Sequence, residues 1–346
     1  MNNLTVGFLV FAFSLGLLPA GAAAQSFTAA GTRAQGMGGA FVGVADDGTA
    51  IYWNPAGLAA GSYFSLVVDG GVGEAAPDGS PMGSQKSSFL IGLSTPALGL
   101  GYYRLRAASV VPPVTLLPID GALPNRNLSL AAPVRVDSLV THHAGITLVQ
   151  SITRAIAIGT TLKLVRGIAA SSAIAAATAK EALESDAAEV LGKPGNRFDL
   201  DVGLMAAGGP LKVGLTLRNL REPSFETADG TTRLTLERQA RAGFSYAVTS
   251  NWVAAADFDL LRSNDGFGKR RDIALGVEGR LAPRAFVRSG VSFNTLDDPA
   301  LEDARGLAYS LGGSYAARAS VFIDGHVTAG GDRTGVHWGI AARFVY

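Results

Sequence analysis

The C-terminal segment, Val336 to Tyr346, alternates between apolar side chains and polar or small ones. The apolar face consists of Val336, Trp338, Ile340, Ala342, Phe344 and Tyr346. The other face holds the polar groups and consists of His337, Gly339, Ala341, Arg343 and Val345. A repeat of two puts alternate side chains on opposite faces of a strand, and apolar-out with polar-in is typical of transmembrane β-strands. The segment therefore predicts that the chain ends in a membrane-spanning strand.

The composition indicates a membrane protein that crosses the lipid bilayer without helices. Of 346 residues, 48% are hydrophobic and only 16% are charged, against roughly 25% charged in an average soluble protein. Past Ala24, the two uncharged segments that come nearest to a membrane helix, Gly48 to Val68 and Ser87 to Tyr103, contain proline and several glycines, so they are poor helices. A closed β-barrel is the remaining structure that satisfies every backbone group in lipid. The absence of cysteine excludes disulfide and zinc–cysteine scaffolds, and a net charge of +1 argues against a nucleic-acid partner.

The same alternation recurs along the chain and predicts an all-β fold, an antiparallel barrel of 14 strands. Tight connections such as Pro96-Ala97 alternate with long ones, as expected when one barrel end is periplasmic and the other faces outside. Two long insertions stand out: 107–137, which is apolar and proline-rich, and 168–196, an alanine-rich segment. We expect a helix in the second, with Ser171 or Ser172 as N-cap and Gly192 as its stop. The predicted strands are Tyr63–Val72, Lys86–Thr95, Leu98–Arg106, Ser138–Val149, Arg154–Gly167, Arg197–Ala207, Leu211–Leu220, Leu234–Val248, Trp252–Leu261, Arg270–Leu281, Pro283–Asn294, Arg305–Ala316, Arg318–Ala329 and Gly335–Tyr346.

The first residues read as an export signal. Val6 to Leu18 is an apolar stretch too short for a comfortable membrane span, and Ala22-Ala23-Ala24 supplies small residues for cleavage. We expect a signal peptide at 1–24, cleaved after Ala24, and a location in the bacterial outer membrane. The alternative is an uncleaved anchor, because the segment before the apolar stretch carries no Lys or Arg.

A glycine-rich motif, Gly31 to Gly61, precedes the first predicted strand. It lacks the G-x-x-x-x-G-K-[ST] pattern of a phosphate loop. Glycine permits close backbone approach, Asn54-Pro55 favours a turn, and Tyr52 and Trp53 supply apolar bulk, so the motif suits a segment packed inside a barrel. The alternative is that Asn54-Pro55 is only a turn leading into the first strand. The motif residues are Gly36, Gly38, Gly39, Asp46, Asp47, Asn54, Pro55 and Ala56.

This motif resembles the N-terminal segment of the long-chain fatty-acid transporter (FadL-like) superfamily, which includes the PorV-type barrels. The resemblance implies an N-terminal hatch at 25–61 that plugs a barrel at 62–346. It also implies hydrophobic substrates that enter from outside and leave sideways through the wall. The C-terminal Phe344 and Tyr346 resemble the signal that the barrel-assembly machinery reads, although Ala341 stands where that signal usually has glycine.

The remaining candidates for chemistry are polar residues expected on the inner face. We found no catalytic motif, so we expect no enzyme, no cofactor and no metal. A two-residue turn at Gly331-Asp332 would place His326 directly opposite His337 in the last hairpin. The lumen-lining polar candidates are Asp272, Glu278, Arg288, Asp324, His326, His337 and Arg343.

Two functions fit this sequence. The first is an outer-membrane channel for passive uptake of hydrophobic small molecules, fatty-acid-like or aromatic, whose other partner is membrane lipid. The alternative is a PorV-like barrel that acts in protein secretion or assembly and binds a periplasmic or secretion partner.

Overall fold

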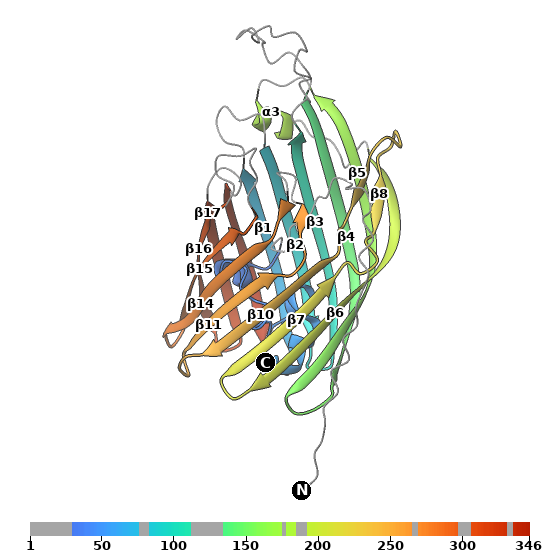
Figure 1. The fold of residues 1–346 in the computed structure, drawn as a ribbon. Coiled ribbons are helices and arrows are strands. Elements are labelled where there is room, and N and C mark those ends of the chain that lie inside the picture. The colour runs from blue at the N-terminus through green and yellow to red at the C-terminus, as the bar shows by residue number, and fades with distance from the viewer. Residues whose placement is uncertain are drawn as a thin grey trace.

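The structure is a computed structural model that describes residues 30–75, 83–111, 134–174, 178–184, 192–264, 269–296, 306–330 and 335–346. Within these ranges, 14 antiparallel strands form one closed barrel, which confirms the predicted fold (Figure 1). The first strand closes the barrel by pairing with the last, from Ser65 opposite Val345 to Glu74 opposite Val336. The barrel strands are β1 (Ser65–Ala75), β2 (Gly83–Ser94), β3 (Leu98–Val111), β4 (Val134–Ser151), β5 (Ile156–Ile174), β6 (Lys193–Gly208), β7 (Leu211–Arg218), β10 (Gln239–Ala247), β11 (Trp252–Asp259), β14 (Asp272–Ala282), β15 (Ala285–Asn294), β16 (Ala308–Arg318), β17 (Val321–Gly330) and β18 (Val336–Val345).

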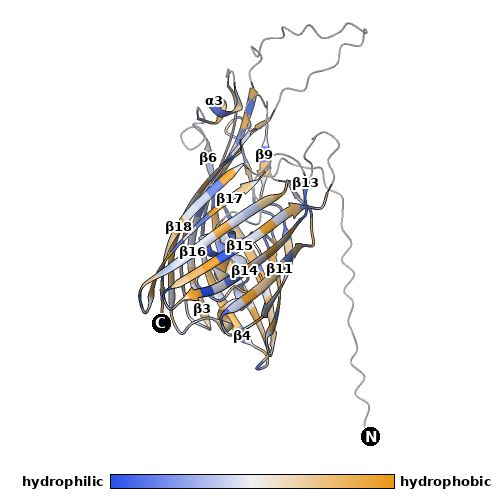
Figure 2. Cartoon of the chain, turned by 90° about the vertical axis from the view of Figure 1, so that its left-hand side faces the viewer, coloured by the Kyte–Doolittle hydropathy of each residue, from blue (hydrophilic) through white to orange (hydrophobic). Residues whose placement is uncertain are grey.

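Side chains along the wall strands alternate between the outer and the inner face, as the sequence predicts. On β18, Trp338 and Ile340 are 56% and 58% exposed on the outer face, whereas Ala341 between the outer positions is 4% exposed. Orange and blue residues accordingly follow one another along the strands in Figure 2. The outer face is therefore an apolar surface suited to lipid, while polar side chains point inwards. No helix in the described ranges is long and apolar enough to cross a membrane.

The barrel is taller on one side, where β3 to β6 rise above the strands opposite (Figure 1). The helix predicted to begin at Ser171 or Ser172 is wrong in its start, because β5 continues to Ile174 in register with β4. Ser171 donates to Asp137 across this pair at 2.6 Å, so strand pairing outweighs the helix propensity of the alanines. The helix that does form, α3 (Ala179–Glu184), begins after Thr178, whose Oγ1 accepts from the Glu181 amide at 3.2 Å. The described helix extends to Glu184, and 185–191, between it and the predicted stop at Gly192, lie outside the described residues.

Two small hairpins lie between barrel strands, and their second strands fall at the starts of the predicted strands Leu234–Val248 and Arg270–Leu281, whose barrel portions begin later, at Gln239 and Asp272. The first consists of β8 (Ser224–Glu226) and β9 (Arg233–Thr235), and the second of β12 (Ser263–Asn264) and β13 (Lys269–Arg270). In the first hairpin Phe225 and Leu234 are buried against Leu139, Val165 and Ala169 of β4 and β5. This hairpin therefore covers part of the inner face of the tall side of the wall.

The residues before β1 lie inside the barrel. They form α1 (Thr32–Gly36), α2 (Ala50–Trp53) and a 3₁₀ helix, η1 (Pro55–Ala60). We call residues 30–61 the inner segment. Its apolar side chains share one buried cluster with wall residues such as Leu90 and Tyr103. The predicted signal peptide at 1–24 and the start of the predicted hatch at 25–29 lie outside the described residues.

Candidate functional site

The inner segment runs against wall positions that have no side chain. A Cβ atom at Gly159, Gly214 or Gly290 would lie well within 3.0 Å of main-chain atoms of the segment. The atoms met are Pro55 C, Val42 O and Met37 C respectively. Because main-chain atoms of two packed elements cannot yield as a flexible side chain can, these inner-face glycines are what lets the segment approach the wall. Further wall glycines that make such contacts are Gly92, Gly203, Gly243 and Gly276.

We therefore expect Gly290→Ala to loosen the inner segment without opening the barrel. The added methyl overlaps the backbone at Met37 and Gly38, and overpacking of this kind costs about 1–3 kcal/mol. Limited proteolysis of folded protein should then cleave the segment faster than in the wild type. Gly325→Ala is the control, since a Cβ there meets nothing closer than Gly339 O at 4.0 Å. Equal cleavage of both variants would contradict the close-packing account.

Wall carboxylates hold the backbone of the inner segment. Asp69 on β1 accepts from the amides of Gly31 and Thr32, at 3.3 and 2.6 Å. Asp257 on β11 accepts from the amides of Phe41 and Val42, each at 2.9 Å. The segment is thus fixed at two sides of the barrel through main-chain donors that would otherwise be buried without partners.

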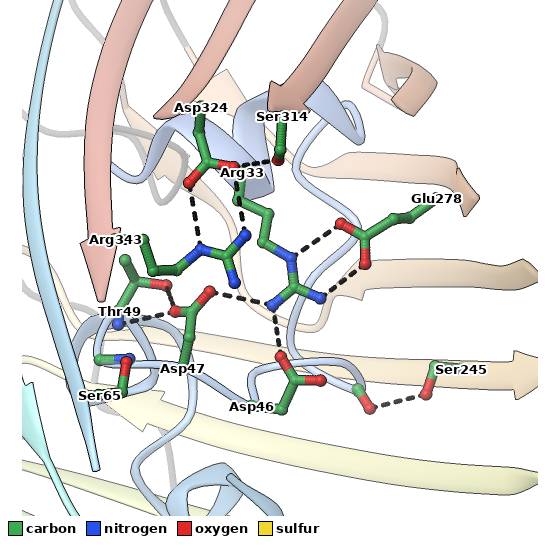
Figure 3. A network of polar contacts seen from close by, with 12 residues as sticks. Arg33, Asp46, Asp47, Thr49, Ser65, Ser245, Glu278, Ser314, Asp324 and Arg343 are labelled. Atoms are coloured by element: carbon green, nitrogen blue, oxygen red, sulfur yellow. Dashed lines mark hydrogen bonds and ion pairs between the residues drawn. The ribbon is translucent and has the colours of Figure 1, made fainter. Parts of the chain in front are cut away.

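An arginine of α1 joins the inner segment to the wall at a third place (Figure 3). Arg33 contacts Asp46, pairs with Asp47 at 3.0 Å, and donates to Glu278 of β14 at 2.6 and 2.8 Å. Asp46 and Asp47 belong to the predicted motif, and Glu278 belongs to the predicted lumen lining. Burial alone would lower the pKa of Arg33, but Asp46 and Glu278 outweigh it and hold that pKa above its ordinary value. The guanidinium is therefore charged and shared among three carboxylates.

The other lumen-lining candidates extend this network along the wall. Arg288 pairs with Glu278 and lies 3.4 Å from Asp324, and Asp324 also accepts from Arg343 at 3.1 Å. Ser314 donates to Asp324 (Figure 3) and accepts from Arg288. Four of the predicted lumen residues, Glu278, Arg288, Asp324 and Arg343, thus meet in one cluster, which Arg33 joins through Glu278. Arg33 lies within the motif, but the sequence reasoning did not single it out.

Asn54 does more than begin a turn into the first strand. Its Oδ1 accepts from the Ala56 amide at 3.1 Å and caps η1, which begins at Pro55. Its Nδ2 donates to Val42 O at 3.0 Å and to Leu204 O of β6 at 3.1 Å. The motif residues Gly36, Gly38, Gly39, Pro55 and Ala56 are likewise buried in the inner segment. Asn54 therefore ties two parts of this segment to each other and to the wall.

Tyr52 and Trp53 form the apolar bulk of the inner segment. They are 1% and 0% exposed. Tyr52 packs edge-on against Tyr103 of β3 and lies under the guanidinium of Arg218, 3.7 Å from ring centroid to Cζ. Trp53 donates from Nε1 to Ala30 O at 3.1 Å. Tyr52 therefore packs against the wall as expected, whereas Trp53 contacts Phe41 and Tyr52 of the inner segment.

The predicted histidine pair is wrong. On β17 and β18, His326 lies opposite Gly339, and His337 lies opposite Thr328. The register differs from the predicted one by two residues, which keeps both histidines on the inner face but separates them. The turn proposed at Gly331-Asp332 lies outside the described residues.

A cavity lies between the inner segment and the wall. It is bounded by Gln35, Gly38 and Gly39 of the inner segment and by residues of β1, β2 and β14–β18, most of which face inwards. His337 and Asp272 from the predicted set both line it, and Asp272 pairs with Arg270 at 2.9 Å. A neighbouring cavity of about 490 Å³ is lined mainly by residues that face outwards, such as Val336 and Trp338. The two cavities share Val72, Gly73, Lys86, Ser87 and Trp338, so only the wall at β18, β1 and β2 separates them.

The structure contains a second buried ionic cluster, which the sequence reasoning did not predict. Lys163 of β5 is fully buried and pairs with Asp199 at 3.0 Å and Asp201 at 2.7 Å on β6. Asn219, after β7, donates its amide to Asp201 at 2.9 Å. The alternation of β5 places Lys163 on the inner face, so the strand pattern carried the signal that could have found it.

Comparisons with known proteins support the fold. A family model described as F plasmid transfer operon, TraF, protein matches residues 97–259, somewhat less than half of the chain. No curated protein matches the sequence.

Solved structures match over nearly the whole chain. The CymD monoaromatic hydrocarbon channel is 12% identical, covers 93% of this chain and 99% of its own, and gives a TM-score of 0.64. A Pseudomonas aeruginosa FadL homologue is 11% identical, covers 94% and 100%, and gives 0.61. The Ralstonia pickettii toluene transporter TbuX is 12% identical, covers 91% and 98%, and gives 0.57. The chain therefore has the fold of the FadL-like outer-membrane barrels.

Proposed function

We propose that this chain is an outer-membrane channel for the passive uptake of hydrophobic small molecules. The fold supports this, since structures of the same architecture are a monoaromatic hydrocarbon channel and toluene transporters. The proposal includes export by a signal peptide at 1–24 and insertion by the barrel-assembly machinery through Phe344 and Tyr346. Both aromatics are exposed on the outer face, at 38% and 76%.

The inner segment makes the barrel unsuited to water-soluble solutes. In the part of the chain that the structure describes, Phe41, Tyr52 and Trp53 are buried across the middle of the lumen. A polar solute would have to cross this apolar cluster or displace the whole segment. A solute that enters from the outside therefore reaches the cavity above the segment, and the segment blocks its further passage along the barrel axis.

The observation that carries the proposal is the pair of cavities on the two sides of the wall at β1 and β2. The wall between them is poor in side chains, because β1 carries Gly70, Gly71 and Gly73 at this height. The outer cavity is lined by the apolar Val72, Val336 and Trp338 together with polar residues such as Glu74 and Arg106, and its volume is in the range of small-molecule sites. An apolar solute gains free energy on leaving the inner cavity for these apolar side chains and the lipid beyond. Lateral passage between β1 and its neighbours is the route that this geometry favours.

A reversible cross-link tests this route. Val72 and Ser87 lie opposite each other on β1 and β2, and both line the outer cavity. The natural chain has no cysteine, so a pair introduced here can bond only with itself. With Val72→Cys and Ser87→Cys, we expect oxidation to reduce uptake of an apolar fluorescent dye into liposomes several-fold, and reductant to restore it. The disulfide holds the two strands together and narrows the space between the cavities.

The control pair lies in a different part of the wall. Tyr246 and Ala254 face each other on β10 and β11, away from both cavities. Oxidation of Tyr246→Cys with Ala254→Cys should leave uptake unchanged. Equal inhibition in both pairs, or none in the first, would contradict lateral passage between β1 and β2.

A role in binding a protein partner is the second candidate. The match of residues 97–259 to the TraF family model favours it, because the description of that model names a protein of a plasmid transfer operon. The tall edge formed by β3 to β6 would present the surface for such a partner (Figure 1). The full-length barrel in liposomes distinguishes the two candidates: uptake of apolar dye no faster than in protein-free liposomes would favour the partner-binding role.

A further inference from the structure

Basic side chains form a row across the outer face of three neighbouring strands. Arg104 of β3 lies opposite His142 of β4, and His142 lies opposite Arg166 of β5. Directly opposed side chains have Cβ atoms about 4.5–5.5 Å apart. Arg106 stands two residues above Arg104 on the same face of β3, about 7 Å along the strand. We call Arg104, Arg106, His142 and Arg166 the basic row.

The basic row lies at the upper border of the apolar outer surface. The outward residues next below it are Tyr102, Ala144 and Leu164, in register with one another on the same strands. Tyr102 and Leu164 are 38% and 55% exposed. From Ile156 to Arg166, strand β5 climbs about 25 Å at about 3.3 Å per residue and a tilt of about 40°. That height equals the apolar band of a transmembrane barrel, so the basic row sits at the headgroup level of the leaflet opposite the short turns.

The basic row does not continue onto β16, β17 and β18. The upper outward positions of these strands carry Tyr309, Val327 and Trp338. These residues are apolar or aromatic and are 63%, 45% and 56% exposed. The row on β3 to β5 therefore marks a location on the wall that these strands do not repeat.

The charges in the row act on one another. Arg104 is within electrostatic range of Arg106, and His142 is within range of both Arg104 and Arg166. Tyr102 Oη lies 2.8 Å from His142 Nδ1, so an aromatic of the apolar surface reaches into the row. Like charges held this close repel, and an anion that bridges them removes the repulsion. Guanidinium groups match the geometry of phosphate oxygens in particular.

We propose that the basic row binds the phosphorylated headgroup of an outer-leaflet glycolipid, whose acyl chains lie on the apolar surface beneath it. The occupant combines phosphate groups with long apolar chains, because the row and the exposed Tyr102, Ala144 and Leu164 are continuous on the outer face. The lipid binds on the outside of the wall. Arg104, His142 and Arg166 lie on other strands than the route for solutes at β18, β1 and β2, whereas Arg106 also lines the outer cavity. Its failure would leave the uptake proposal untouched.

Native mass spectrometry of the purified barrel in a non-ionic detergent tests the site. The probes are lipid A with two phosphates, the same lipid without phosphate, and inorganic phosphate at equal concentration. We expect the wild type to retain the phosphorylated lipid and neither of the other two. With Arg104→Gln and Arg166→Gln together, apparent affinity should fall about tenfold or more, since hydrogen bonds between charged groups contribute at this level.

Arg154→Gln is the matched control, because Arg154 is exposed in the turn at the other end of the same β4–β5 hairpin. It should bind the phosphorylated lipid as the wild type does. Equal retention of the dephosphorylated lipid, or unchanged affinity in the double variant, would overturn the proposal. Competition by inorganic phosphate at the concentration of the lipid would also overturn it, since the site would then hold a free anion. Slower migration of the heated protein on a gel checks that each variant is folded.

Discussion

A barrel that lacks residues 25–61 is expected to conduct ions in large steps across a planar bilayer, whereas the full chain conducts little. The inner segment supplies most of the buried cluster that crosses the lumen, including Phe41, Tyr52 and Trp53. Without it the inner face is lined by polar and charged residues such as Asp69, Asp257 and Glu278, which water can solvate. The 14 strands pair with each other and not with the segment, so we expect the wall to persist.

Permeability to small antibiotics in cells should rise in parallel with the conductance. The control replaces 25–61 with a flexible Gly-Ser chain of equal length, which keeps the connection but not the packing. This control should conduct almost as well as the deletion, because a flexible chain makes neither the apolar contacts nor the bonds to Asp69 and Asp257. A deletion that folds yet stays closed would show that the segment is not the plug, and would favour the partner-binding role.

The alternation of side chains predicted the barrel because it reports directly on its environment. On β18 each outward residue from Val336 to Tyr346 meets lipid and each inward one meets the lumen, so local sequence suffices. Strand ends were found where turn chemistry is strong, as at Leu98 after Pro96, at Leu211 after Pro210 and at Trp252 after Asn251. They were missed where pairing alone extends a strand, as in β5 beyond Gly167.

The parts that sequence reasoning missed depend on contacts between distant residues. The predicted register of β17 and β18 depended on the length assumed for the turn between them. The observed pairing differs by two residues, which leaves every side chain on the same face, so the alternation pattern cannot reveal the wrong register. The inner-face glycines read as ordinary members of a polar face until the backbone of the inner segment is placed against Gly159 or Gly290. The role of Arg33 could not be predicted from the residues around it, because its partner Glu278 is 245 residues away in the sequence.

Arg33→Ala is expected to release the inner segment more readily than any other single change in it. Arg33 is 10% exposed and contacts three carboxylates, of which Asp47 is 3% exposed and Glu278 13%. Removing one partner of a buried ion pair costs about 3–5 kcal/mol, because the remaining charges stay buried without compensation. Denaturant titration followed by protease access to the segment should show a loss of this order. Arg233→Ala is the control: its ion pair with Glu226 is more than half exposed, and such pairs contribute about 0–1 kcal/mol.

The pH dependence separates loss of the charge from a general loosening. Asp47 lies in the inner segment, outside the membrane-spanning strands; burial alone would raise its pKa, but Arg33 holds the pKa of this carboxyl below its ordinary value of 3.8. A lowered pKa in the folded state stabilises docking at pH values above 3.8, and this stabilisation is lost as the pH falls through the lowered pKa. Arg33→Ala removes the charge that lowers the pKa of Asp47 most, while burial still raises this pKa. Acid should therefore weaken docking of the variant much less than that of the wild type, or strengthen it. If acid releases the segment from both proteins over the same pH range, Asp47 and Arg33 do not act together and the account of this network is wrong.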